Sequence, residues 1–202
     1  MTDRPTRKSP RHERTFMLIK PDGVKRGLTG EILARLEKRG LKIVALEMIM
    51  ATREQIDEHY PKDPAWVSRL GEKSLATYEK YGFDAVEEVG TADPAEIGKK
   101  VRAWLIDFMV SGPVVKLVIE GVHAVDMVRK LAGVTMPSAA ELGSIRGDYS
   151  VESAALANME KRAVQNLVHA SETTEEAEHE IAHWFGKDPA FRYDRAEDTL
   201  VF

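Results

Sequence analysis

Cysteine is absent from the 202 residues of this sequence. Disulfide bridges, thiol nucleophiles and zinc–thiolate sites are therefore excluded, and the composition fits a reducing compartment. The sequence also has no long uncharged apolar run, and its charged start is not followed by an apolar stretch. We therefore expect neither a membrane span nor a secretory signal, and we predict a cytoplasmic protein.

An excess of positive charge is absent too. The net charge is -4 and the sequence pI is near 5.9, which argues against a surface built to hold a nucleic-acid backbone. An anionic ligand would have to be held by a local cluster of cations. The basic stretch 1–13 carries almost no apolar residues, and we predict that it is a disordered tail.

A hydrophobic content of 43% is enough to bury the core of one domain, which we expect over 14–185. Strands are predicted over 15–19, 41–50, 114–120 and just before His169, with helices between them and after the last one. This order favours an α+β, ferredoxin-like split-βαβ fold, in which helices cover one face of a four-stranded antiparallel sheet. A helical insert is predicted at about 61–107, and a long functional loop over 133–165. We expect the tail 186–202 to dock through Phe191, Tyr193 and Phe202.

The stretch that ends the last strand places His169 where an apolar run gives way to a polar turn. Asn166 and Ser171 flank it, and Glu180 lies on the helix that follows, from which it can fold back toward the histidine. A neutral imidazole can attack phosphorus, and a carboxylate on its other nitrogen fixes the tautomer. A lone histidine at a strand end is more often structural, so the other polar residues decide between the two interpretations.

Cations and hydroxyls occur at several other strand ends and loops. Lys20 ends the first strand ahead of a Pro-Asp-Gly turn, and the set continues with Tyr60, Arg129, Thr135 and Arg146. Phosphoryl transfer needs its peripheral oxygens neutralised and its nucleophile held in line, which paired arginines do well. The glycine-rich phosphate loop that ends in Gly-Lys is missing, so a histidine acceptor is the better hypothesis.

Several segments of the chain resemble the nucleoside diphosphate kinase family, and they occur in the family's order. They are 14–24 (RTFMLIKPDGV), 59–60 (HY), 111–115 (SGPVV), 145–149 (IRGDY) and 166–171 (NLVHAS). The resemblance extends from about 14 to 185. It implies the split-βαβ fold together with transfer of a γ-phosphoryl group between nucleotides.

The resemblance also implies roles for single residues. His169 would take the phosphoryl group on Nδ1, with Glu180, Lys20 and Tyr60 completing the catalytic set. The residues that would bind nucleotide are Lys20, Arg129, Thr135, Arg146, Asn166 and Ser171. Mg²⁺ would be bound through the nucleotide phosphates, so we expect no metal site made of protein ligands alone. The family habit of oligomerisation implies a homo-oligomer, either a tetramer or a hexamer.

The sequence departs from the family pattern in three places. The insert displaces the position that stacks on the base, which falls on Val101 when counted back from Ser111; Trp66 and Trp104 are the nearby aromatic residues. We predict that Trp66 stacks, because Trp104 shares an apolar stripe and is expected in a core. The segment 153–161 lengthens the loop before Asn166. Glu172 replaces the family's usual aspartate.

The function predicted from these residues is a nucleoside diphosphate kinase that works by a ping-pong mechanism. One alternative is a non-catalytic nucleotide-binding or scaffold relative, which would have lost the histidine, a phosphate-binding arginine or the lysine. The other is an RNA-binding split-βαβ module, but the strands lack paired aromatic residues and the net charge is acidic. We therefore expect nucleoside di- and triphosphates as ligands, and no nucleic acid.

Overall fold

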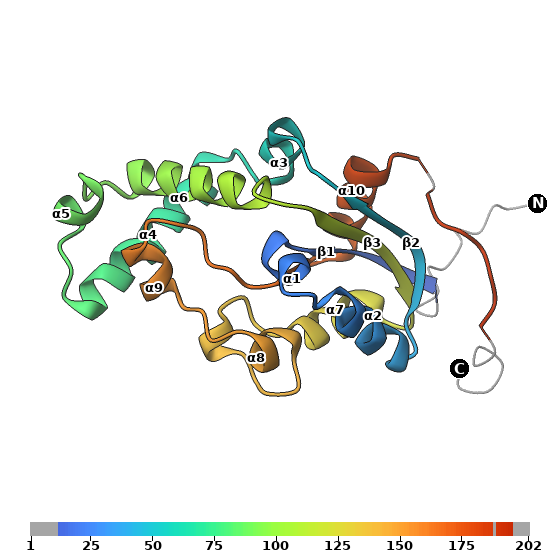
Figure 1. Ribbon diagram of the computed structural model, residues 1–202. Coiled ribbons are helices and arrows are strands. Elements are labelled where there is room, and N and C mark those ends of the chain that lie inside the picture. Colours follow the sequence, from blue (N-terminus) through green and yellow to red (C-terminus); the bar gives the residue numbers. More distant parts are fainter. Residues whose placement is uncertain (1–11, 188, 196–202) are drawn as a thin grey trace, which may run out of the picture.

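The computed structural model describes residues 12–187 and 189–195. Its centre is a four-stranded antiparallel sheet with the order β2-β3-β1-β4, which confirms the predicted fold (Figure 1). The strands are β1 (Glu13–Ile19), β2 (Lys42–Ile49), β3 (Val114–Gly121) and β4 (Val168–Ala170). The short β4 pairs with the end of β1, where Leu18 lies opposite His169. This register brings the end of β1 beside the predicted acceptor.

Helices cover both faces of the sheet, so the prediction that they lie over one face is wrong. On one face α2 (Thr29–Lys38) and α7 (Ala124–Ala132) pack against β1 and β3, and on the other face α10 (Thr174–Phe185) and α3 (Arg53–His59) do so. The cause lies in β1, where Phe16, Met17 and Leu18 are all completely buried. Successive side chains of a strand point to opposite faces, so an uninterrupted apolar run requires cover on both.

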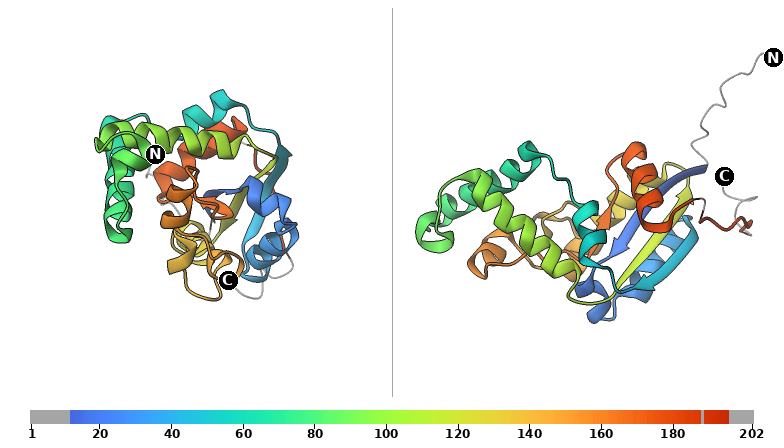
Figure 2. Two further views of the ribbon diagram at one scale, coloured as in Figure 1. Left: turned by 60° about the vertical axis from the view of Figure 1, so that its left-hand side comes forward. Right: turned by 90° about the horizontal axis from the view of Figure 1, so that it is seen from above.

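The insert extends from one end of the sheet as a pair of helices joined by a short one (Figures 1 and 2). These are α4 (Pro64–Tyr81), α5 (Ala85–Val89) and α6 (Pro94–Met109). At Gly71 and Gly98 the two long helices touch, since a Cβ on either glycine would lie 1.9 Å from a backbone oxygen of the other helix. Tyr78 and Ile97 form a small core against which Trp104 packs, as predicted for Trp104. The insert is therefore a tightly packed unit.

The stretch 133–165 contains regular structure, which corrects the prediction of a long loop. It holds the 3-10 turn η2 (Pro137–Ala139), α8 (Ile145–Tyr149) and α9 (Ala154–Met159), and the Pro-Asp-Gly turn after β1 forms α1 (Pro21–Lys25). Each helix spans fewer than two full turns, which is too short to reveal itself through apolar periodicity. In Figure 1, α9 lies beside α4 and away from the sheet, and the two helices are in contact.

The two ends of the chain differ from their predictions in part. Glu13 belongs to β1, so the predicted tail 1–13 overlaps the sheet, and residues 1–11 lie outside the described part. At the other end the backbone N–H of Phe191 donates to the Val44 carbonyl at 2.8 Å, although the Phe191 side chain is 77% exposed. Tyr193 docks through its hydroxyl on the Ile43 carbonyl, and Phe202 lies outside the described residues. None of the helices in the described ranges is both long and apolar enough to cross a membrane.

Candidate active site

The segment before His169 is fixed by contacts with the end of β1. Leu167 has a φ of 68°, a left-handed conformation that is unusual for a bulky residue. Its N–H donates to Asp22 Oδ2 at 3.0 Å, and its carbonyl accepts from the backbone N–H of Lys20 at 2.8 Å. Gly23 permits this approach, because a Cβ there would lie 3.0 Å from the Leu167 oxygen. These contacts set the position from which β4 presents His169.

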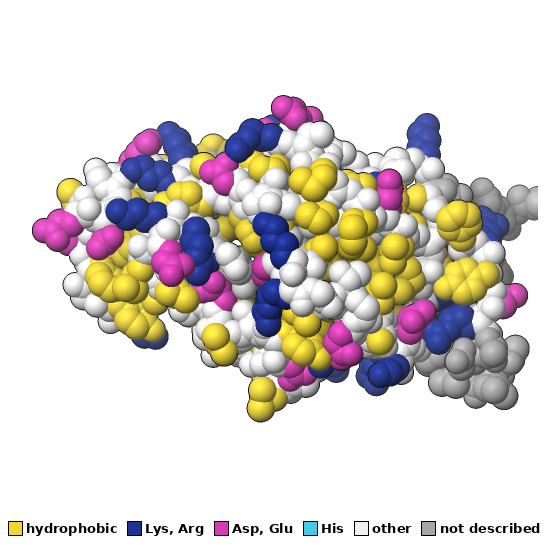
Figure 3. Space-filling view, in the orientation of Figure 1, with side chains coloured by type: hydrophobic (Ala, Val, Ile, Leu, Met, Phe, Trp, Pro, Cys, Tyr) yellow, Lys and Arg dark blue, Asp and Glu magenta, His cyan; other side chains and the backbone are white. Residues whose placement is uncertain are grey.

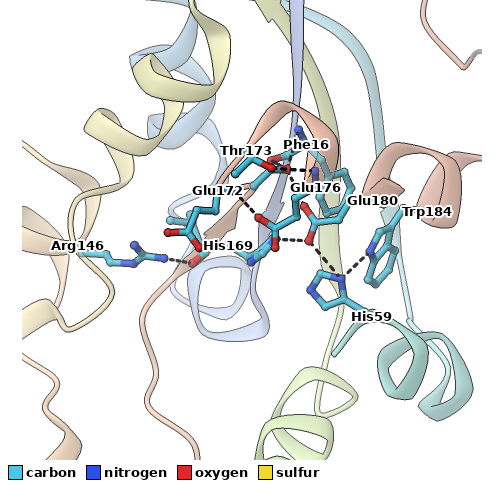
Figure 4. Close-up of polar contacts among 11 residues, drawn as sticks. Phe16, His59, Arg146, His169, Glu172, Thr173, Glu176, Glu180 and Trp184 are labelled. Atoms are coloured by element: carbon cyan, nitrogen blue, oxygen red, sulfur yellow. Dashed lines mark hydrogen bonds and ion pairs between the residues drawn. The ribbon is translucent and has the colours of Figure 1, made fainter. Parts of the chain in front are cut away.

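Within the described residues, the imidazole of His169 is hydrogen-bonded through one of its two nitrogens (Figure 4). Its Nε2 lies 2.6 Å from Glu180 Oε1, which confirms that Glu180 folds back from α10. The other oxygen of this carboxylate accepts a 2.6 Å hydrogen bond from the Ser171 hydroxyl. With Nε2 bound to the carboxylate, Nδ1 is the nitrogen left for reaction.

Ser171 needs a correction, because the sequence predicts it among the nucleotide-binding residues. Its side chain is completely buried, and it does not line the cavity that holds the other site residues. The Ser171 hydroxyl also accepts a hydrogen bond from the backbone N–H of Phe16 at 3.3 Å. Its contact with the site is the hydrogen bond that it donates to the Glu180 carboxylate.

His59, at the end of α3, is a site residue to which the sequence assigned no role. Its ring meets the His169 ring edge-on, with centroids 4.8 Å apart, and its Nδ1 lies 3.5 Å from Glu180 Oε1. Trp184 Nε1 donates to the same Nδ1 at 3.2 Å (Figure 4). The only signal in the sequence is its position next to Tyr60 at the end of a helix begun by the Thr52 capping box.

Burial keeps both histidines neutral. It lowers the pKa of His169 to about 3, with a further contribution from the charge of Lys20, and it lowers the pKa of His59 to about 3 as well. Burial also raises the pKa of Glu180, against the effect of its hydrogen bond from Ser171. The imidazole of His169 is therefore uncharged at neutral pH, as a nucleophile must be.

Lys20 and Arg146 are buried cations whose side chains are held in place by hydrogen bonds to other groups of the protein. Lys20 Nζ donates to Asn166 Oδ1 at 2.7 Å, and the Asn166 amide donates to the Thr135 carbonyl at 2.9 Å. Burial, helped by the charge of Arg146, lowers the pKa of Lys20 to about 8. Arg146 donates to three backbone carbonyls, those of Gly133, Asn166 and Val168, at 2.6 to 3.1 Å. Burial also lowers its pKa, to about 10.

Arg129 differs from these two cations because it stands at the mouth of the site. Its side chain is 43% exposed, and its nearest acidic partner is Glu172, 3.5 Å away and 73% exposed. An ion pair this exposed contributes little stability. The Arg129 guanidinium is therefore available to an incoming anion.

These residues line one cavity of about 940 Å³. We call one part of it the polar end, which is lined by Lys20, Tyr60, Arg129, Thr135, Arg146, Asn166 and His169. The other part is the apolar end, where the apolar lining residues are Trp66, Leu70, Val101, Leu105, Ala154 and Ala163. Polar residues near them in sequence also line the cavity, namely Lys73, Ser74, Thr77, Asn158 and Arg162. Trp66 stacks on Tyr60 with ring centroids 6.3 Å apart, while Trp104 does not line the cavity. An elongated ligand with an anionic head and a flat apolar body fits such a cavity.

Known proteins resemble the chain over most of its length. The sequence profile of the nucleoside diphosphate kinase family matches residues 13–65 and 95–190. The unmatched residues 66–94 lie inside the predicted insert and contain most of α4 and all of α5. Two curated relatives named nucleoside diphosphate kinase come from archaea. That of Pyrobaculum aerophilum is 48% identical over 87% of this chain and 96% of its own length, and that of Archaeoglobus fulgidus is 35% identical over 94% and 97%.

Solved structures agree with these relatives. The crystal structure of an NDP kinase from Pyrobaculum aerophilum has a TM-score of 0.86 at 46% identity, covering 90% of this chain and 100% of that one. A transition-state mimic of nucleoside-diphosphate kinase from Borrelia burgdorferi, with bound vanadate and ADP, has a TM-score of 0.75 at 32% identity, covering 94% and 96%. From the extent of the profile match and the identity to these relatives, the chain belongs to the nucleoside diphosphate kinase family.

Proposed function

We propose that this chain transfers the γ-phosphoryl group of a nucleoside triphosphate to a nucleoside diphosphate by way of a phosphohistidine at His169. The observation that carries the proposal is a neutral imidazole whose Nε2 is bound to Glu180 and which lies among the buried cations Lys20 and Arg146. A neutral nucleophile and an electropositive cavity are what phosphoryl transfer requires.

Each half-reaction forms one bond and breaks one. In the first, His169 Nδ1 bonds to the γ-phosphorus while the bond between that phosphorus and the β–γ bridging oxygen breaks, which releases the diphosphate. Phosphorylation makes the ring more acidic at Nε2–H, and the Glu180 carboxylate 2.6 Å away holds that proton. In the second half-reaction, a terminal oxygen of the acceptor diphosphate attacks the phosphorus and the Nδ1–P bond breaks. The enzyme returns to its starting state.

The polar end holds the phosphates in this proposal. Arg146 keeps two guanidinium N–H groups beyond the three that bind carbonyls, and these, with Arg129, face the charge that develops on the migrating group. Lys20 and Thr135 contact the other phosphate oxygens, and Asn166 the ribose. Because Lys20 and Asn166 are hydrogen-bonded to each other, binding requires little reorganisation of these side chains.

Mg²⁺ fits this cavity as an ion bound through the nucleotide's phosphates. Among the described acidic residues that line it, Glu180 is bound to His169 and Ser171, Glu172 faces Arg129, and Glu176 accepts a hydrogen bond from the backbone N–H of Glu172. That leaves no set of free carboxylates to hold the ion alone, which suits a cation that keeps several waters and takes its other ligands from phosphates. When bound, the ion would neutralise phosphate charge; the protein groups position and accept the phosphoryl group.

The apolar end holds the base. Trp66 lines it from α4 and is backed by Tyr60, so a planar base can stack against the indole without disturbing the sheet. Stacking of this kind depends on the π face that all bases share, and by itself it discriminates little among them.

We also propose that the protein is a cytoplasmic homo-oligomer. The edge strand β2 pairs only with β3 in the sheet, and Leu46, Met48 and nearby Met50 are 49%, 55% and 62% exposed. In Figure 3, hydrophobic side chains gather in the right half of the molecule, the half in which Figure 1 shows β2. Phe191 and Tyr193 already bind the Val44 and Ile43 carbonyls, so the part of the edge that supports the proposal is the apolar stretch from Leu46 onward, which can pair with another chain, here a second copy. Light scattering coupled to size-exclusion chromatography tests this; a mass of 22.6 kDa at micromolar concentration would contradict it.

The test of the function is incubation of the purified protein with ATP labelled on the γ-phosphate, without acceptor. Label should remain on the protein, survive base and be lost in acid, as a phosphohistidine requires, and a nucleoside diphosphate should then remove it. His169→Ala should take up no label and still bind nucleotide. If the wild-type protein binds ATP but acquires no label, it is the non-catalytic relative.

A further inference from the structure

One guanidinium group joins the segment that enters the insert to the helix that leaves it. Arg102, on α6, donates from Nη2 to the carbonyls of Asp57 and Tyr60, at 2.7 and 3.1 Å. Its Nε donates to the Pro61 carbonyl at 3.1 Å, and its Nη1 donates to Asp57 Oδ1 at 2.7 Å. The Arg102 side chain is 15% exposed. Four hydrogen bonds from one largely buried side chain therefore hold the turn at 57–61 against α6.

This turn is the end of α3, where a helix needs outside partners. The last carbonyls of a helix have no hydrogen bond within it, and a positive charge near them is favourable. Tyr60 follows the last helical residue, and its ψ of 135° turns the chain out of the helix. The carbonyls that Arg102 binds are of this kind. Arg102 thus fixes the direction in which the chain leaves α3, and with it the backbone of Tyr60.

The Tyr60 ring lies beside the acceptor histidine's neighbours. Its centroid is 5.1 Å from that of His59 and 6.3 Å from that of Trp66, and the His59 ring contacts His169. Among the described residues no group is hydrogen-bonded to the Tyr60 hydroxyl, and this oxygen is not one of the enclosed polar atoms. Burial raises the pKa of Tyr60, so the hydroxyl keeps its proton at neutral pH. It is a donor that faces the cavity and is open to a phosphate oxygen.

We infer that Arg102 is a positioning residue, which holds Tyr60 in the place that phosphoryl transfer requires. Arg102 does not line the cavity, so it acts through Tyr60 and not on the nucleotide. A group misplaced by about 1 Å can cost roughly a hundredfold in rate. The inference rests on the proposed function and adds to it. The insert takes part in forming the polar end of the cavity, to which α6 contributes this side chain.

The first experiment measures the rate constant of phosphoenzyme formation at saturating ATP labelled on the γ-phosphate, with the full chain. Arg102→Leu should lower it by about ten- to a hundredfold, because Tyr60 loses the contacts that fix its backbone. A folded Arg102→Leu that reacts at the wild-type rate would overturn the inference. If the wild-type protein forms no phosphoenzyme, it is the proposed function that fails.

Arg53→Leu is the matched control. Arg53, the first residue of α3, pairs with Asp107 on α6, and both side chains are 58% exposed. This ion pair also joins α3 to α6, which lie side by side in Figure 1, but it does so at the end of α3 away from Tyr60. The rate should stay at the wild-type value. A loss as large as that of Arg102→Leu would show that the hold on Tyr60 is not what matters.

A double-mutant cycle with Tyr60→Ala separates positioning from general support of the fold. Tyr60→Ala should lower the rate at least as much as Arg102→Leu does. Adding Arg102→Leu to it should then change the rate by less than about twofold, since a residue that acts through Tyr60 has nothing left to position. Effects that multiply, or a Tyr60→Ala variant at the wild-type rate, would contradict the inference.

A milder substitution keeps the test usable if Arg102→Leu does not fold. Arg102→Gln retains part of the aliphatic stem but loses the charge and the planar fork that reaches several carbonyls. Its rate should fall in the same direction, and the fall should again vanish in the Tyr60→Ala background. A lower melting temperature together with a wild-type rate would show that Arg102 only stabilises the insert.

Discussion

The two ends of the cavity are built in opposite ways. At the polar end Lys20, Asn166 and Arg146 are tied by hydrogen bonds to one another or to backbone carbonyls. Lys20 follows β1, Asn166 precedes β4, and Arg146 on α8 binds the carbonyl of the first β4 residue. At the apolar end the walls are helices that lie outside the sheet, and Trp66, Leu70, Val101 and Leu105 line them. The chemistry thus rests on the part of the fold that the family profile matches. The base contacts that we propose rest largely on α4, most of which the profile leaves unmatched.

This difference predicts that substitutions at the polar end change catalysis, whereas those at the apolar end change binding. The largest effect is expected for Arg146→Ala, which removes a charge-assisted contact to the migrating group and should lower kcat by roughly two to four powers of ten. The substitution also leaves three backbone carbonyls without the hydrogen bonds that Arg146 donates to them, so thermal stability should fall. Arg129→Ala, whose side chain is 43% exposed, should lower kcat with little change in melting temperature. Equal stability losses in both variants would contradict the distinction drawn between these arginines.

Trp66→Ala is the corresponding change at the apolar end. Loss of the stacking surface should weaken binding of all nucleoside diphosphates by a similar factor, roughly five- to a hundredfold for a stacking contribution of about 1–3 kcal/mol. The tryptophan fluorescence change on adding nucleotide should disappear, and kcat at saturation should change little. Trp104→Phe serves as a control, because Trp104 packs in the insert core. If Trp66→Ala lowers stability and leaves affinity unchanged, Trp66 is a structural residue.

The buried charges of the polar end predict an asymmetric pH profile. His169, with a pKa near 3, stays neutral down to about pH 5, so protonation of the acceptor should cause no loss of kcat/KM on the acid side. Lys20, with a pKa of about 8, is charged below that pH and loses its proton above it. Values of kcat/KM, which report the free enzyme, should therefore fall by about tenfold per unit above pH 8. Lys20→Arg, which stays charged, should lose this alkaline decline; a decline that persists would assign it to another group.

Stability should respond to the same groups on the acid side. The folded-state pKa values of His59 and His169, both about 3, lie below the ordinary value of 6.5, so the unfolded chain binds more protons between these limits. Unfolding free energy should consequently decrease as pH falls from 6.5 toward 3. Urea titrations at pH 7 and pH 5 measure it, with His169→Ala expected to show a weaker dependence.

The smallest effect on rate is expected from Ser171→Ala. Removing this hydroxyl leaves one buried oxygen of Glu180 without its partner, which should lower the unfolding free energy by about 1–3 kcal/mol. The rate should fall only a few-fold, because His169 keeps its own bond to the carboxylate. Nucleotide affinity should not change. A selective loss of affinity would return Ser171 to the nucleotide-binding set.

Local sequence patterns were enough to predict the sheet and the His169–Glu180 pair. Thr52 and Asp93 cap their helices as their positions suggest, and α10 begins just after the strand end, so its second turn carries Glu180 back over the histidine. Segments of this kind are determined by residues close to them in sequence. The family motifs supplied the roles of the remaining polar residues, and those roles stay predictions.

Features that depend on distant contacts could not be predicted. Cover on both faces of the sheet, the contact of α9 with α4 and the burial of Ser171 all depend on where separate segments meet in space. The role of His59 likewise appears only when α3 and α10 place it between Trp184 and His169.

The left-handed conformation of Leu167 has a consequence for how the protein folds. Its N–H partner, Asp22, lies 145 positions earlier in the chain, and a contact of such separation forms against a large loop-closure entropy. Until it forms, no local preference holds Leu167 in this conformation, and β4 has no fixed direction. The acceptor histidine is thus oriented only when the beginning and the end of the domain have met. During synthesis on the ribosome, the enzyme cannot become active before its last strand has emerged and paired with its first.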